Sequence, residues 1–174
     1  TCPQIITRRY RVTDDCGNYI FVTQTITVDD NINPTATAPA NTTYVCIADV
    51  PAASVADITD EADNCTANPT VIYNGESTSG NCPLTITRTW AITDDCGNTI
   101  TVTQIITVDD NINPTATAPA NATFDCINDV PAASAADIID EADNCTANPT
   151  VVYNGETTSG TCPLIITRTW DVSD

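Results

Sequence analysis

The cysteines of this 174-residue chain recur at an interval of 80 residues, and no other feature constrains its fold as strongly. The surrounding sequence recurs with them: the stretch VDDNINPTATAPAN occupies residues 28–41 and, unchanged, residues 108–121. Such a period indicates a tandem array of one structural unit. The equivalent cysteines are Cys2, Cys82 and Cys162; Cys16 and Cys96; Cys46 and Cys126; and Cys65 and Cys145.

The period divides the chain into three portions. We expect the C-terminal part of one repeat at residues 1–33, a complete repeat with its linker at 34–113, and the N-terminal part of a third repeat at 114–174. Because the sequence contains no Met, we also expect it to be a piece of something longer or a processed chain.

The charge of the chain is strongly negative, with 23 acidic residues against five Arg and a net charge of −18. A surface of this kind repels nucleic acid and anionic membranes and attracts divalent cations. No apolar run is long enough to span a membrane. We therefore expect neither nucleic acid nor membrane as a partner.

The complete repeat carries four cysteines, none of them spaced as CxxC, and the chain has no His. This pattern favours structural disulfides in an oxidising, extracellular environment over zinc ligation. Since neither His nor Lys is present to act as a base beside a nucleophile, we expect no enzymatic activity.

The strongest structural signal is the alternation of apolar residues with Thr across residues 84–108, which predicts a long antiparallel hairpin around the turn DDCGN. Shorter strands are predicted at TTYVC (42–46), AASVADI (52–58) and TVIYNGE (70–76). No segment has helical periodicity. Six or seven short strands in about 80 residues predict an all-β fold of tandem immunoglobulin-like β-sandwich repeats.

The partial copies show which positions tolerate change. The equivalents of Trp90 in the other copies are Tyr10 and Trp170, so this position is always aromatic. We therefore expect a core anchor here. Tyr44 is aromatic again in the next copy, whereas Val45 becomes Asp. Position 44 is therefore predicted to point inward and position 45 toward water.

Arg88, with Arg168 as its counterpart in the next copy, shares the parity of the apolar face. We expect it to form a structural ion pair at the edge of the sheet, with Asp57 or Glu76 as its partner. An arginine that binds a ligand is the alternative.

The segment RTWAITDDCGN (88–98), together with the upstream DNC (63–65), resembles the hyalin-repeat (HYR-like) domains and the related repeats of giant cell-surface adhesins in Bacteroidota. These adhesins include gliding-motility adhesins of the SprB type and cargo of the type IX secretion system. The resemblance covers the whole repeat. It implies an immunoglobulin-like sandwich on an extracellular stalk at the bacterial cell surface, without catalytic activity, and it does not identify a ligand.

Strand geometry restricts the disulfides. Cys82 and Cys96 lie at opposite ends of one extended strand, roughly 40 Å apart, whereas the Cα atoms of a disulfide lie within about 7 Å. In a sandwich, Cys65 and Cys96 fall at one end, and Cys46 and Cys82 at the other. The predicted pairs are therefore Cys65–Cys96, Cys46–Cys82 and Cys126–Cys162, with partners outside the chain for Cys2, Cys16 and Cys145.

The repeated acidic stretch lies where one sandwich ends and the next begins, and we interpret it as the joint between repeats. The acidic loops before Cys65 and Cys96 are expected to meet it, and Ca²⁺ takes about six to eight oxygens of this kind. The spacing DDNINP is similar to the calcium-binding linkers of cadherins, without their complete motif. The alternative is a solvated polar spacer. The predicted Ca²⁺ ligands are Asp29, Asp30, Asn31, Asn33, Asp60, Glu61, Asp63, Asp94, Asp95, Asp109, Asp110, Asn111, Asn113, Asp140, Glu141, Asp143 and Asp174.

These observations favour a structural role in a long extracellular adhesin stalk or surface fibre, with calcium-stiffened joints between its domains. Neighbouring repeats of the same chain are the expected partners. Two alternatives remain open: a self-assembling filament or sheath, in which identical chains are the partners, and a repeated module that binds surface glycans or another ligand.

Overall fold

The computed structural model describes residues 2–174, which form two compact units. Of the described residues, the first unit comprises 2–43 and 51–108, and the second comprises 44–50 and 109–174. Over residues 2–174, the regular structure consists of strands and four short 3-10 helices. Among the described residues, no helix is both long and apolar enough to cross a membrane.

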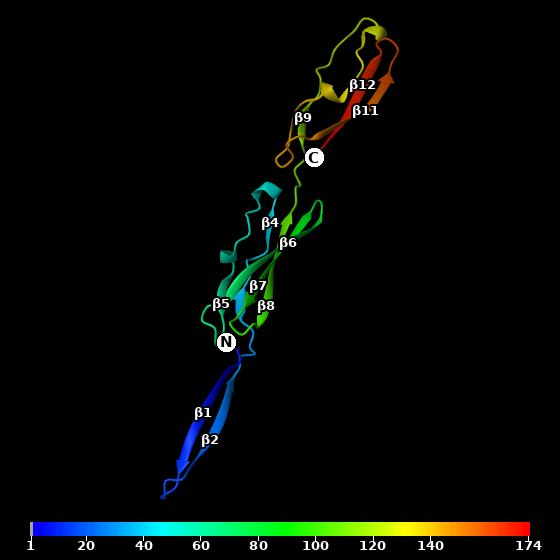
Figure 1. Ribbon diagram of the computed structural model, residues 1–174. Helices are drawn as coiled ribbons and strands as arrows, with labels where there is room; N and C mark the ends of the chain where they lie inside the picture. Colours follow the sequence, from blue (N-terminus) through cyan, green and yellow to red (C-terminus); the bar gives the residue numbers. More distant parts are fainter. Residues whose placement is uncertain (1) are drawn as a thin grey trace. The chain divides into compact units, whose positions relative to one another are not determined.

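The first unit begins with a hairpin of two long strands, β1 (Gln4–Thr13) and β2 (Tyr19–Val28), shown in blue in Figure 1. The strands pair in antiparallel register from Gln4 opposite Val28 to Thr13 opposite Tyr19. Their connecting turn is closed by Asp14, whose carboxylate accepts hydrogen bonds from the backbone of Cys16 and from Asn18. The alternating apolar and Thr residues thus form a hairpin in this copy too.

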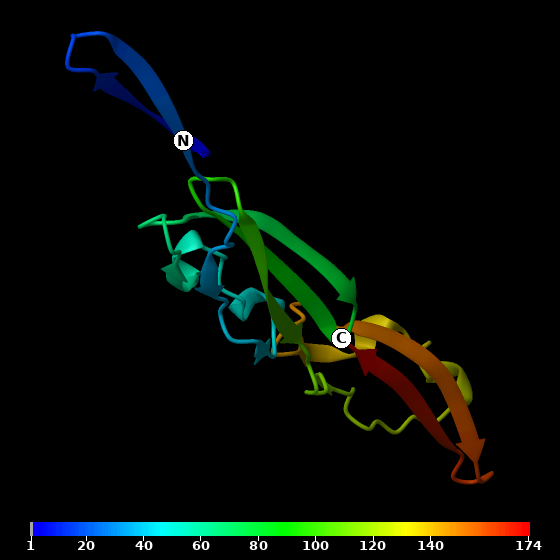
Figure 2. The same cartoon turned by 90° about the horizontal axis from the view of Figure 1, so that it is seen from below.

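The rest of the first unit is a two-sheet β-sandwich. One sheet contains β3 (Thr35–Thr37) and β5 (Thr59–Ala62), and the other has the order β4 (Thr42–Tyr44), β8 (Thr99–Val108), β7 (Leu84–Thr93), β6 (Thr70–Gly80). Figure 2 shows β6, β7 and β8 side by side. The predicted hairpin at 84–108 is confirmed, and so is the all-β, immunoglobulin-like fold.

The core of this sandwich is built around Trp90 of β7, which is fully buried together with Ile58 and Ile92. Its indole Nε1 donates a hydrogen bond of 3.0 Å to the carbonyl of Ser54, so the one polar atom of the ring is satisfied. The prediction of Trp90 as a core anchor is therefore confirmed. Partly buried side chains surround this cluster: Ala36, Ala53, Val71, Tyr73, Ile100 and Val102.

The segment AASVADI is not a strand, contrary to the prediction, because it contains the 3-10 helix η2 (Val55–Asp57). The Ser54 side chain accepts a hydrogen bond from the backbone N–H of Ala56, and the Asp57 carboxylate accepts one from the N–H of Ser54. This reciprocal cap satisfies the backbone groups locally and so competes with strand pairing. A similar 3-10 turn, η1 (Ile47–Asp49), follows Cys46.

Asp57 is thereby excluded as the partner of Arg88. The Arg88 Nε donates instead to Glu76 Oε2 at 2.9 Å, and its Nη2 donates to the carbonyl of Pro51 at 2.6 Å. The predicted structural ion pair is confirmed with Glu76, but the expected place at the sheet edge is wrong for Arg88, because β7 lies between β6 and β8. Tyr44 is half-buried and Val45 exposed, also as predicted.

The second unit repeats much of this arrangement. Strand β9 (Thr115–Thr117) pairs with β10 (Ile139–Ala142), and β11 (Thr150–Ser159) pairs with β12 (Ile165–Ser173). Two 3-10 helices, η3 (Ile127–Asp129) and η4 (Ala135–Asp137), lie between β9 and β10. The register of β11 and β12 equals that of β6 and β7 moved by one period.

Candidate metal centre and disulfides

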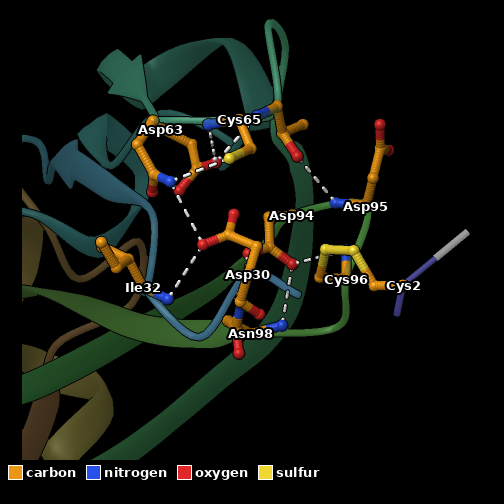
Figure 3. The surroundings of a disulfide bond; sticks show 11 residues. Cys2, Asp30, Ile32, Asp63, Cys65, Asp94, Asp95, Cys96 and Asn98 are labelled. Atoms are coloured by element: carbon orange, nitrogen blue, oxygen red, sulfur yellow. Dashed lines mark hydrogen bonds between the residues drawn. A yellow bond between two sulfur atoms is a disulfide. The ribbon is translucent and has the colours of Figure 1, made fainter. Parts of the chain in front are cut away.

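Three acidic segments of the first unit converge, as Figure 3 shows. Asp30 follows β2, Asp63 follows β5 and Asp94 follows β7. One carboxylate oxygen of each residue lies within 4.8 Å of the other two. The predicted meeting of the linker with both acidic loops is therefore seen for these three residues.

Local backbone hydrogen bonds hold all three carboxylates in place, and Asp30 Oδ1 accepts one from the N–H of Ile32 at 3.1 Å. Asp63 Oδ2 accepts hydrogen bonds from the backbone N–H groups of Cys65 and Thr66, at 2.9 and 2.8 Å. Asp94 Oδ1 accepts from the N–H groups of Cys96 and Asn98, both at 2.8 Å, while its Oδ2 accepts from Asn98 Nδ2 at 2.7 Å. Such Asp turns are set by short-range sequence, so the carboxylates are oriented without help from a cation.

Two asparagines attach the linker to these turns. Asn64 Nδ2 donates to Asp30 Oδ1 at 3.2 Å, and Asn98 Nδ2 donates to the backbone carbonyl of Asp30 at 3.0 Å. Neither Asn64 nor Asn98 is among the predicted site residues. Their positions in the motifs DNC and DDCGN, beside the predicted carboxylates, are the signal that could have identified them.

The cluster is negatively charged and largely removed from water. Asp30 is 8% exposed and Asp94 is 6% exposed, and the buried atoms Asp30 Oδ2 and Asp63 Oδ1 have no hydrogen-bond partner. Within residues 2–174 the ion pairs are Arg88–Glu76 and Arg168–Glu156, neither of which includes a carboxylate of the cluster. A buried carboxylate oxygen without a partner is costly, so this arrangement favours a cation.

Hydrogen bonds keep the carboxylates of Asp63 and Asp94 ionised. Backbone hydrogen bonds from Thr66 and Cys65 hold the pKa of Asp63 below its ordinary value. Burial raises the pKa of Asp94, but the hydrogen bonds from Asn98, Cys96 and Gly97 together outweigh it, and the net shift is downward. Both groups therefore carry a full negative charge at neutral pH.

A second cluster of the same composition lies in the second unit, where Asp110, Asp143 and Asp174 also bring one oxygen each to within 4.8 Å of one another. Asn144 Nδ2 donates to both carboxylate oxygens of Asp110, at 3.2 and 3.3 Å. Asp143 Oδ1 is buried without a hydrogen-bond partner, as Asp63 Oδ1 is. Hydrogen bonds from Thr146 and Cys145 lower the pKa of Asp143 as well.

The other predicted acidic ligands lie outside both clusters. Asp60 and Asp140 adopt positive φ angles of 57° and 56° within β5 and β10. The linker residue Asn111 donates to Asp109 at 3.1 Å. The predicted acidic ligands outside the clusters are Asp29, Asp60, Glu61, Asp95, Asp109, Asp140 and Glu141. The Asn ligands stay predictions: Asn31, Asn33, Asn111 and Asn113.

The disulfides differ from all three predicted pairs. Cys2 is bonded to Cys96 and Cys46 to Cys145, with Cα–Cα distances of 4.9 and 5.1 Å. The predictions Cys46–Cys82 and Cys65–Cys96 are therefore wrong, as are the predicted external partners of Cys2 and Cys145. Cys126–Cys162 is wrong too, because both residues are exposed thiols.

The physical reason for this error is the assumption that each bridge stays within one repeat. Both bridges join a cysteine of one sequence repeat to a cysteine of the next. Cys2 is the equivalent of Cys82, and Cys145 is the equivalent of Cys65. The cysteines predicted at one end of the sandwich are thus bonded to those predicted at the opposite end of the following repeat.

Residues 34–108 match the model of the family described as "HYR-like domain with 4 cysteines". This match is consistent with an extracellular-type repeat module of the kind found in adhesion over residues 34–108. Neither the curated proteins nor the solved structures contain a match to the chain.

Proposed function

We propose that this chain is a segment of a long, non-enzymatic extracellular stalk or fibre at a bacterial cell surface, in which Ca²⁺ stiffens the joints between repeats. The HYR-like match supports the extracellular repeat module. The observation that carries the cation is the cluster of Asp30, Asp63 and Asp94, with its two buried oxygens that lack hydrogen-bond partners.

The donor set fits a hard cation. The Cys65 thiol lies beside Asp30, but burial and the charge of Asp30 raise its pKa, so it is a neutral thiol rather than a thiolate ligand. The carboxylate oxygens suit Ca²⁺ or Mg²⁺, and Ca²⁺ accepts irregular sets of carboxylates, backbone carbonyls and waters. In this proposal Asp30 of the linker and Asp63 and Asp94 of the sandwich hold the ion together. Binding would therefore link the linker to the sandwich and offset the repulsion among three like charges.

Calorimetric titration of Ca²⁺ into the chelator-treated chain tests this proposal. We expect two binding events, one at each acidic cluster. Asp30→Asn should abolish one event, because it removes the charge at the unpartnered oxygen while Asn keeps an acceptor for the backbone N–H of Ile32. Asp95→Asn is the matched control, since Asp95 is exposed and lies outside the cluster.

Two results would contradict the calcium joint: no heat with the unaltered chain, or equal losses in the Asp30 and Asp95 variants. The stalk itself is tested separately, by imaging the native material. A thread one domain wide supports a stalk, whereas a wider helical object supports the filament alternative. Small-angle scattering with and without chelator then reports whether the cation extends the chain.

A further inference from the structure

We propose that the two disulfides belong to two parallel covalent paths that run from repeat to repeat, each made of a short chain segment and a disulfide. We call these paths cords, and each bears tension without including the whole polypeptide. The inference rests on the proposed role as a stalk, but its covalent content is tested independently of calcium and of imaging. The observations that carry it are the bridges Cys2–Cys96 and Cys46–Cys145.

The first cord consists of the central strand of each sandwich and one disulfide. Cys82 immediately precedes the proline before β7, and Cys96 lies in the turn after it. Cys2 has the same position before β1, and it is bonded to Cys96. A covalent path therefore runs from Cys82 along β7 to Cys96, and through the bridge to the start of the equivalent strand in the preceding repeat.

The second cord uses the other two cysteines. It runs along the chain between Cys65 and Cys46, crosses the bridge to Cys145, and continues along the chain to Cys126. Cys145 and Cys126 are the equivalents of Cys65 and Cys46. The path thus advances by one period and ends at Cys126, which is the equivalent of Cys46, the cysteine that formed the bridge.

Three exposed thiols are positioned like their bonded counterparts. The backbone N–H of Cys16 donates to Asp14 as that of Cys96 donates to Asp94. The Sγ atoms of Cys65 and Cys145 each accept a hydrogen bond from the preceding Asn, at 2.9 and 2.8 Å. Cys46 and Cys126 both precede a 3-10 helix in extended conformation. In an array of these repeats, the thiols at these positions are therefore placed to form the same two bridges at every joint.

Formation of each further link is an oxidation. Two thiols lose two protons and two electrons as the S–S bond forms, and an external disulfide compound accepts them and is reduced to two thiols. The extracellular, oxidising environment expected for this chain supplies such an oxidant.

The mechanical consequence is a short maximum length. In each repeat of 80 residues, the first cord includes only the 14-residue separation from Cys82 to Cys96. At roughly 3.3–3.6 Å per residue, this segment extends to about 50 Å, whereas a complete unfolded repeat extends to about 280 Å. An oxidised array therefore hardly lengthens when its sandwiches unfold, and a single cut in the chain leaves the repeats connected.

Peptide mapping of the unaltered chain tests the links without any substitution. After alkylation of exposed thiols, trypsin without reductant yields the peptides 1–8, 12–88 and 89–168. We expect 1–8 to remain attached to 89–168 until a reductant is added, and alkylation at Cys16, Cys65, Cys126 and Cys162. A second protease, cleaving at acidic residues, isolates the Cys46–Cys145 pair. Release of peptide 1–8 without reductant, or a Cys46–Cys82 peptide, would overturn the cords.

Force spectroscopy with handles on the two ends of the chain tests the load path. By itself, the Cys46–Cys145 bridge shortens the extended chain by 99 residues, and the Cys2–Cys96 bridge shortens it by 94. The two loops overlap, so the shortenings do not add, and the shortest covalent path crosses Cys46–Cys145 alone. Reduction should therefore lengthen the fully stretched chain by about 340 Å. Cys2→Ser and Cys145→Ser should each leave the stretched length within about 20 Å of the unaltered chain, while the double variant matches the reduced chain. Full extension of the unreduced chain would overturn the proposal, whatever the calcium titration shows.

Discussion

Strands β7 and β12 carry nearly the same sequence, yet they differ in what covers them. In both, the indole of the Trp donates to a Ser carbonyl, at 3.0 Å from Trp90 and 2.9 Å from Trp170. The Trp ring also contacts a Tyr of the neighbouring strand, with centroids 5.4 and 5.5 Å apart. Trp90 is nevertheless fully buried, whereas Trp170 is only half-buried.

The difference comes from β8. Strand β7 lies between β6 and β8, whereas within residues 2–174 β12 pairs with β11 alone. Side chains of β8, including Val102 opposite Trp90, pack against the core of the first unit. Register, capping and the Trp–Tyr contact are thus properties of the local sequence, while burial of the anchor requires a third strand.

The largest expected effect is the loss of stability when the Trp of either unit is replaced. Trp90→Ala should destabilise the first unit by about 3–5 kcal/mol, because it removes a fully buried ring. Trp170→Ala should cost the second unit about half as much, since part of that ring already contacts water. Hydrogen exchange of the β6–β7 and β11–β12 amides measures each effect, with the unaltered unit as the internal control. Equal losses would show that β8 contributes little to the core.

Replacement of the Arg in each ion pair should have an effect of intermediate size on stability. The Arg88 side chain is 5% exposed and that of Arg168 is 20% exposed, although both donate to a Glu and to a Pro carbonyl. Arg88→Met should cost about 1.5–3 kcal/mol, and Arg168→Met about 1 kcal/mol after allowance for screening.

Chemical denaturation measures these two costs separately. Arg88→Met is followed by Trp90 fluorescence in a Trp170→Phe background, and Arg168→Met by Trp170 fluorescence in a Trp90→Phe background. Each background without the Arg substitution is its control. A larger effect at Arg168 would contradict the role of burial.

The smallest effect is a loss of stability at alkaline pH in both units. Burial, then the charge of Glu76, raises the pKa of Tyr73 above 10.0, and burial and Glu156 raise that of Tyr153. A raised pKa in the folded state contributes stability that is present below pH 10 and is lost as the pH rises through the folded-state value. Tyr73→Phe and Tyr153→Phe keep the ring contact and should each weaken this pH dependence.

A pH titration monitored by tryptophan fluorescence, with exposed thiols alkylated beforehand, measures this change. The alkylation is needed because thiolates would otherwise exchange with the disulfides in the same pH range. An unchanged alkaline transition in both Phe variants would assign the pH dependence to other groups.

Much of the fold followed from the sequence because its signals are local. Alternation of Thr with apolar residues predicted the hairpin of β7 and β8, and the aromatic residue shared by all copies predicted Trp90 as the anchor. The segment AASVADI was misread, since the reciprocal cap of Ser54 and Asp57 satisfies its backbone more locally than a strand would. Periodicity alone does not register such a cap.

The convergence of acidic segments was also predictable, because it needs only the order of strands and turns in a sandwich. Which carboxylates meet was not: Asp30 enters the cluster and its neighbour Asp29 does not, since adjacent residues in an extended linker point in different directions. The asparagines that attach Asp30 to the two turns depend on the same side-chain directions.

The cysteine period by itself determined that the chain repeats one cysteine-bearing unit, and the composition determined that this unit is acidic. The alternation of Thr with apolar residues determined that it is built of strands. Only the tertiary structure decided that Cys2 meets Cys96 and Cys46 meets Cys145. Because each cysteine recurs one period later, the sequence does not distinguish a bond within a repeat from a bond to the equivalent cysteine of the next repeat. The choice depends on which thiols come within disulfide distance, and that distance is a property of the folded chain.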